Sequence, residues 1–373
     1  MDPTRPFCPN LACVARGQTG QGHIGIHSRQ EPRFLCTACR QTFTATKGPA
    51  LSRLRTSAET VRLSVTLSAH GCPLQALVVA FGSAERTVAC GLARAGLQGQ
   101  AVPQPLVAPP RDLGQGQADA IRVNKQGGSV WRALAMMVAT RLWLAGEVSA
   151  QRALPLSRRL IARVKRCAAR RPLVVCTDGL GSSIRAMRET WRAPVPTGKD
   201  GRPRRRPGRH GVIAHVVKRS ERRRVGETDR RSLDGTPARV ETLRRRSQGD
   251  GVIKTAYSER LHATFRARLA PLARRSRALA RHPLTWHHGM DLIGTVYNFC
   301  TPHARLALAT LGAGMGCVPQ TPAMAAGITD HGWSVRELWS YHVPLPRWTP
   351  PKQRGRPARA LKRLMKRWCG DHG

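Results

Sequence analysis

The segment "PLVVCTDG", residues 172–179, decides how the central part of the chain is interpreted. A short apolar run bounded by turn residues is typical of a strand buried on both faces. This strand ends at Asp178, and the carboxyl edge of a buried sheet is a common place for a functional site. Because Asp-Gly is also a turn signal, a purely local role for Asp178 is the alternative.

The sequence before this strand predicts three more strands and a helix. A first strand carries Asp119, "KQGG" makes a turn, and further strands follow over 129–139 and 141–148. The segment "LPLSRRLIARVKRCAARR" has apolar residues at helical spacing. Three strands, a helix and a strand with an acid at its end predict an α/β fold, a ribonuclease-H-like catalytic domain. We expect it over 117–342, with a basic insert near 197–250.

A third acid lies in a strongly basic segment, residues 253–282, which holds eight Lys or Arg and the single carboxylate Glu259. The run "AYSERLHATFRARLAPL" predicts a helix whose apolar stripe excludes Glu259. A carboxylate near a helix start is also favoured by the helix dipole, which is the structural alternative. The expectation that this acid is functional depends on whether it meets other acids.

Asp119, Asp178 and Glu259 could together bind two divalent ions. Such a pair of ions clamps the attacking and leaving oxygens of an in-line phosphoryl displacement. Carboxylate oxygens favour Mg²⁺ or Mn²⁺ over zinc. The alternative for Asp119 is a solvated strand residue. We expect Arg260 and Arg266, on the same predicted helix as Glu259, to hold DNA against this site.

Residues 1–50 contain two short-spaced cysteine pairs, Cys8 with Cys13 and Cys36 with Cys39. Two such pairs about twenty residues apart are typical of a tetrahedral Zn²⁺ site with four thiolates. The short strands expected between the pairs make this segment a zinc ribbon. Four unrelated reduced cysteines are one alternative, and competition by His23 or His27 as a ligand is another.

Residues 57–97 predict a helix-turn-helix DNA-binding domain. Ser57 can cap a helix that ends near Ala69, and a second helix runs from Pro73 to Phe81. Gly82 makes the turn before a third helix, with Ser83 as its expected cap. The second helix of such a motif lies in the major groove, and an ordinary helical hairpin is the alternative. The residues expected to contact bases are Ser83, Glu85, Arg86 and Thr87. A linker rich in Pro and Gly is expected over 98–116.

The composition points to a polyanionic partner. The formal net charge is +42, from 63 basic and 21 acidic residues, and phosphate neutralisation favours such a chain on nucleic acid. Neither a membrane span nor a signal peptide is expected, so we place the protein in the cytoplasm, on the nucleoid. The basic tail, 343–373, is expected either to enter a minor groove or to be a disordered polybasic end.

Several motifs resemble DDE-type transposases of bacterial insertion sequences, in particular the insertion-sequence-one-like group. The resemblance covers about residues 6–340. Its motifs are "CPNLAC" with "CTAC", "VVCTDG", "TAYSERLHATFRARLAPLARR", "YNFC" and "TPAMAAGITDHGWSVRELW".

The resemblance implies a metal-binding triad of Asp119, Asp178 and Glu259. It also implies double-stranded DNA partners, namely the terminal inverted repeats and the target, and a homo-oligomer that holds both ends. The chain departs from the family pattern at Ala120, Lys254 and His262, and 80 residues separate the second and third acids. A catalytically decayed or repurposed sequence-specific DNA-binding protein is therefore the alternative, and a nuclease that cuts without joining strands is a third hypothesis.

Overall fold

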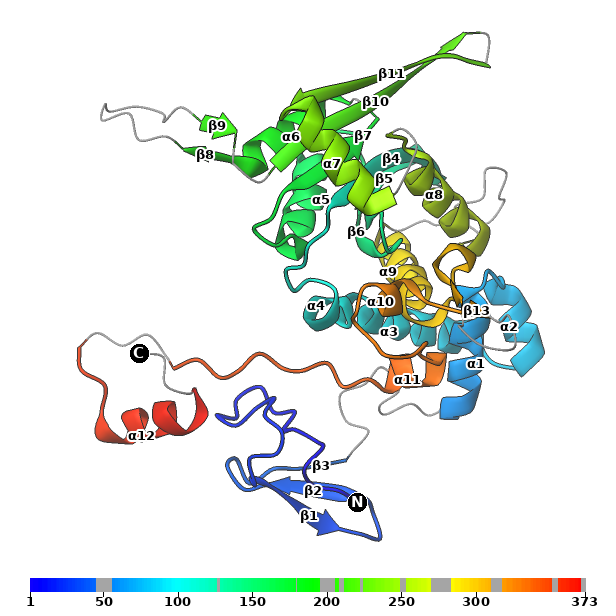
Figure 1. Cartoon of the computed structure of the whole chain (residues 1–373). Helices are drawn as coiled ribbons and strands as arrows, with labels where there is room; N and C mark the ends of the chain where they lie inside the picture. The colour runs from blue at the N-terminus through cyan, green and yellow to red at the C-terminus, as the bar shows by residue number, and fades with distance from the viewer. Residues whose placement is uncertain are drawn as a thin grey trace. The chain divides into compact units, whose positions relative to one another are not determined.

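The computed structural model divides the chain into two compact units, residues 1–55 with 340–373, and residues 56–339. Each unit is described separately (Figure 1). The structure describes residues 1–44, 56–125, 128–178, 180–194, 205–207, 211–221, 224–248, 253–269, 283–309, 317–350 and 355–369.

The first unit is a small antiparallel sheet joined to the C-terminal helix. Its strands are β1 (Ile24–Ser28), β2 (Arg33–Cys36) and β3 (Thr42–Thr44), in the order β1-β2-β3. The helix α12 (Arg359–Trp368) packs onto it through Trp368, which is 5 % exposed and shares a core with Cys8 and Phe34. The segment 343–373, predicted as a separate basic tail, thus belongs to the same unit as the cysteine-rich segment.

The second unit begins with three helices, α1 (Ala58–Ala69), α2 (Leu74–Phe81) and α3 (Glu85–Ala101). The predicted cap at Ser57 is confirmed, because its side chain accepts a hydrogen bond from the Thr60 N–H at 3.1 Å. Gly82 ends α2 in the left-handed region, with φ of 56°. Ser83 does not cap α3; the cap position is Ala84, and the Ser83 hydroxyl donates to the Phe81 carbonyl.

The predicted linker 98–116 is instead part of the folded unit. The helix α3 continues to Ala101, and α4 (Pro103–Leu106) follows it. Within this segment, Gly99 allows close packing of α3 on α9 (Pro283–Cys300), since a Cβ there would lie 2.8 Å from the Asp291 carbonyl oxygen. Gly99 therefore serves helix packing, not chain flexibility.

The centre of the second unit is a six-stranded mixed sheet in the order β11-β10-β7-β4-β5-β6 (Figure 1). The pairs β4–β5, β5–β6 and β10–β11 are antiparallel, whereas β7 is parallel to both β4 and β10. The predicted strands before and at "PLVVCTDG" are confirmed, and the predicted basic insert contributes two strands to the same sheet. The strands are β4 (Gln115–Lys125), β5 (Gly128–Met137), β6 (Trp143–Ser149), β7 (Leu173–Thr177), β10 (Gly211–Glu221) and β11 (Arg224–Asp234).

Helices cover the sheet and build its core. The helix α8 (Ala256–Arg268) and α9 pack on β4, β5 and β6 through Phe265, Trp286 and Trp143. The helix α7 (Pro237–Gln248) packs on β7 through Val240 and Leu243. The remaining elements are α5 (Leu154–Cys167), α6 (Gly181–Trp191), β8 (Arg192–Pro194), β9 (Arg205–Pro207), η2 (Ala304–Leu306), β12 (Leu308–Ala309), β13 (Cys317–Val318), α10 (Pro322–Ala325) and α11 (Val335–Ser340). Across the described ranges, every helix is too short or too polar to cross a bilayer.

Candidate functional site

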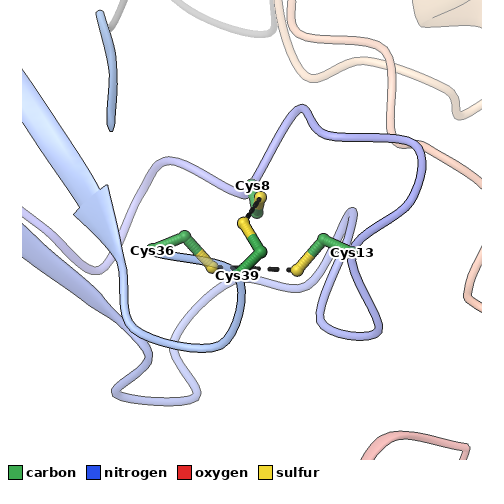
Figure 2. Close-up of side chains that lie close together, drawn as sticks. All are labelled: Cys8, Cys13, Cys36 and Cys39. Carbon is green, nitrogen blue, oxygen red and sulfur yellow. Dashed lines mark hydrogen bonds between the residues drawn. The ribbon is translucent and has the colours of Figure 1, made fainter. Parts of the chain in front are cut away.

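The four predicted zinc ligands form one cluster (Figure 2). The Sγ atoms of Cys8 and Cys39 are 3.7 Å apart, those of Cys13 and Cys36 are 3.8 Å apart, and all four lie within 4.8 Å of one another. A tetrahedral ion with Zn–S bonds of about 2.3 Å requires sulfur atoms about 3.8 Å apart. The cluster could therefore hold a zinc ion, and the sulfurs are too far apart for disulfides, which need about 2.05 Å.

Two tight turns bring the thiols together. In the first turn the Asn10 carbonyl accepts from the Cys13 N–H at 3.0 Å, and the Asn10 side chain accepts from the Ala12 N–H. In the second, Arg40 adopts a left-handed φ of 59° and its N–H donates to the Cys36 carbonyl at 2.8 Å. Burial raises the pKa of Cys13 to about 11. A buried thiol group of this kind gains most from a cation that stabilises the thiolate form.

Histidine does not join the cysteine cluster. His23 is buried, but its ring packs edge-on against Trp368, with ring centroids 5.2 Å apart and planes at 77°. His27 is exposed on β1. The only group of three or more such side chains with converging ligand atoms in the described residues is the four cysteines.

Strand register brings Asp119 level with Asp178. In the parallel pair β4–β7, Gln117 lies opposite Cys176. Two residues further along each strand are Asp119 and Asp178, and side chains two residues apart share a face of a sheet. Adjacent strands are about 4.8 Å apart, so the two acids are neighbours on one face.

The start of α8 crosses this same face. The Gln117 side chain accepts from the Ser258 N–H at 2.9 Å and donates to the Lys254 carbonyl, which fixes the first turn of α8 against β4. Glu259 lies in that first turn, and its carboxylate accepts from the Thr255 hydroxyl at 2.8 Å. The three predicted acids therefore come from β4, the end of β7 and the start of α8.

The acids influence one another electrostatically. Asp119 is mostly buried, with 14 % of its side chain exposed. Burial raises the pKa of Asp119, and the negative charges of Asp178 and Glu259 raise it further. Neighbouring carboxylates destabilise one another's ionised forms unless a cation compensates them. Asp119 thus lies within electrostatic reach of both Asp178 and Glu259.

Sequence reasoning missed the cations that contact this acid group. Arg152 forms an ion pair with Asp178, and its guanidinium stacks on the Trp131 ring at 4.8 Å from the ring centroid. Arg132, 1 % exposed, lies in the middle of β5. A charged residue inside the apolar run "VWRALAMM" is the one sequence signal that could have identified Arg132.

Arg132 fixes the orientation of His262 towards Asp119. The Arg132 Nη2 lies 2.7 Å from His262 Nδ1, and His262 Nε2 lies 3.5 Å from an Asp119 carboxylate oxygen. Since a guanidinium can only donate, Nδ1 must accept and the ring proton sits on Nε2, facing Asp119. Burial, together with the charges of Arg132 and Arg266, holds the pKa of His262 well below its usual range. His262 is therefore neutral, and its Nε2–H lies near Asp119 without a hydrogen-bond partner in the described residues.

The acid group is open, not a closed metal cage. In the described residues the four cysteines are the one group of three or more such side chains whose ligand atoms could already hold an ion, and the three acids do not form such a group. Mg²⁺ commonly keeps several waters and is bound by one or two carboxylates together with substrate phosphates. Any cation bound at Asp178 would have to compete with Arg152, which already pairs with that carboxylate.

The predicted DNA-contacting residues lie on two helices. Glu85, Arg86 and Thr87 are exposed at the start of α3, and Ser83 is half-buried beside it. On α8, Arg260 is exposed, whereas Arg266 is half-buried and its charge lowers the pKa of both Arg132 and His262. Of the two α8 arginines predicted to contact DNA, Arg266 is thus the one near Arg132 and His262.

Comparison with known proteins gives no family for this chain. No protein-family model and no curated protein matches it. The function proposed below consequently depends on the chemistry of the two sites.

Proposed function

We propose that the protein is a DDE-type transposase, which binds the ends of its insertion sequence and catalyses metal-dependent DNA strand cleavage and transfer. The observation that carries this proposal is that Asp119 on β4 lies within electrostatic reach of Asp178, at the end of β7, and of Glu259, in the first turn of α8. A chain of net charge +42 has few acids, and acids that only faced solvent would have no reason to lie close together. A metal-dependent site for a phosphate-bearing polymer explains both.

The strand order supports the finer assignment of a ribonuclease-H-like domain. Three antiparallel strands, β4 to β6, are followed by α5 and then by β7, which returns parallel to β4. The next strand, β10, is parallel to β7. This is the order expected from three strands, a helix and a strand that ends in an acid.

Asp119, Asp178 and Glu259 would hold the catalytic Mg²⁺ or Mn²⁺. When bound, two such ions stabilise the attacking and leaving oxygens of a phosphoryl transfer. His262, held neutral 3.5 Å from the Asp119 carboxylate, would add no positive charge beside the metal. No covalent intermediate with a protein side chain is required, because water and then a DNA 3′-hydroxyl act as nucleophiles.

The first unit would bind DNA as a zinc-stabilised ribbon with a basic helix attached. Of the ten residues of α12, five are Lys or Arg and none is acidic. All five are exposed, while Trp368 anchors the helix to the core of the unit. The start of α3 would supply a helix-turn-helix contact to bases, and neutralised phosphates would contribute most of the affinity.

A non-catalytic DNA-binding protein is the second candidate. The specific observation that favours it is that a cation already occupies Asp178, through the ion pair with Arg152. A chain that had lost its catalytic metal would gain stability from such a pair. Both candidates predict that the protein binds DNA, but only the transposase predicts that it cleaves DNA.

Cleavage of a labelled duplex carrying the DNA that flanks the coding region tests the proposal. We expect strand cleavage with Mg²⁺ or Mn²⁺ by the wild type and its loss in Glu259→Gln. The matched control is Glu59→Gln, which also removes an exposed carboxylate from the first turn of a helix. If binding is intact and the wild type never cleaves, the non-catalytic candidate stands instead.

A further inference from the structure

A second site of opposite charge lies on the other side of α8. A cavity of about 340 Å³ opens there, at the lower end of the range of about 300–1,000 Å³ typical of ligand sites. We call it the cation pocket. Its principal lining residues are Arg141, Lys254, Tyr257, Arg260, His303 and Arg305.

The cation pocket concentrates positive charge without a compensating acid in its lining. Among the described residues that line it, four are Arg or Lys and none is Asp or Glu. Burial lowers the pKa of His303, and the charges of Arg141, Arg260 and Arg305 lower it further. Like charges held this close repel one another, and an anion in the cavity would relieve that repulsion.

The pocket is partly pre-organised around Arg141. This residue lies between β5 and β6 in the left-handed region, with φ of 60°. Its guanidinium lies 3.6 Å from the centroid of the Tyr257 ring, and the Tyr297 hydroxyl donates to its backbone carbonyl at 3.2 Å. A non-glycine residue held in this conformation costs free energy, and such positions cluster at ligand sites.

The pocket is distinct from the acid group because the two use different faces of α8. Tyr257, Arg260 and Leu261 line the cavity. Glu259 is two residues from both Tyr257 and Leu261, which corresponds to a rotation of about 200° around a helix. The helix therefore separates a carboxylate site from a cationic one.

We propose that the cation pocket binds one nucleotide of a DNA strand whose neighbouring phosphodiester lies at the acid group. This inference rests on the proposed function. The cations would hold the phosphate, as charge-assisted hydrogen bonds to phosphate oxygens are strong. The buried side chains of Met136 and Leu261 give the cavity an apolar floor for the sugar or base. The acid group and the cation pocket, on different faces of α8, would then position the same DNA strand.

Salt-dependent binding of a fluorescent single-stranded oligonucleotide to the full chain, without divalent ions, tests this proposal. The double variant Arg260→Gln/Arg305→Gln should weaken binding at least tenfold. It should also reduce the slope of log K against log salt by about 0.7 for each lost phosphate contact. The charge-preserving double variant Arg260→Lys/Arg305→Lys should keep most of the affinity. The variant Arg170→Gln/Arg171→Gln, which removes two exposed cations elsewhere, should have a smaller effect.

Competition with inorganic phosphate and with thymidine 5′-monophosphate separates the possible sources of the phosphate. Competition by the nucleotide well above that by phosphate supports the proposal. If the Gln double variant binds the oligonucleotide like the wild type, with an unchanged melting temperature, the proposal is wrong. The proposal is equally wrong if the Gln double variant loses binding of free phosphate or of the mononucleotide but binds the oligonucleotide like the wild type. Because no cleavage is measured, an inactive protein can still pass this test, so the pocket and the transposase proposal fail separately.

Discussion

Trp368→Ala should weaken zinc binding, although Trp368 lies more than 300 residues from the first cysteine in sequence. Its side chain is 5 % exposed and shares a core with Cys8, Cys13 and Cys36. Replacing a buried Trp by Ala costs about 3–5 kcal/mol. Because folding and metal binding of such small units are coupled, we expect a loss of about 100-fold or more in zinc affinity, at 1.4 kcal/mol per tenfold.

The assay is competition for zinc between the purified full chain and a chromogenic chelator. Leu364→Ala is the matched control, since Leu364 lies on the same helix and is 37 % exposed. It should bind zinc like the wild type. Equal zinc affinities for the two variants would refute the reasoning that α12 is a structural part of the ribbon.

Other predictions concern the second unit. Burial raises the pKa of Asp291 to about 7, above about 3.9 for an unfolded Asp. The folded state then binds the extra proton, so stability falls as pH rises from about 4 to 7. In urea unfolding at several pH values, the free energy of unfolding of Asp291→Asn should not fall over this range. An equal fall in the wild type and the variant would contradict this prediction. Gly96→Ala should destabilise by about 1–3 kcal/mol, because its Cβ would meet the His288 backbone. Gly91→Ala on the same helix, 3.4 Å from a flexible Val61 methyl, should cost nothing in thermal unfolding.

The sequence predicts best where spacing alone dictates the geometry. A short spacer places the two thiols of each cysteine pair close together, and the structure confirms that the two pairs meet in one cluster. The acid after "LVVC" lies at the end of a buried strand, as predicted. These features depend on residues close together in sequence and on strand periodicity.

Contacts between distant segments could not be predicted in the same way. The tail was expected to enter a minor groove or to be a disordered polybasic end, because nothing near it in sequence shows that Trp368 packs into the core of the cysteine-rich segment. Segment 98–116 looked like a linker because glycine and proline signal flexible loops in isolation, whereas Gly99 permits the close approach of α9. Similarly, nothing local pairs Arg152 with Asp178 or Arg132 with His262.

The most direct test of the central claim compares cleavage rates of Asp119→Asn, Asp178→Asn, Glu259→Gln and the triple variant in Mn²⁺. If the three acids act as one site, each single variant should lose at least about 100-fold. The triple variant should lose little more, because residues that act as a unit are not additive. Full activity in Glu259→Gln, or losses that multiply independently in the triple variant, would contradict a shared catalytic site.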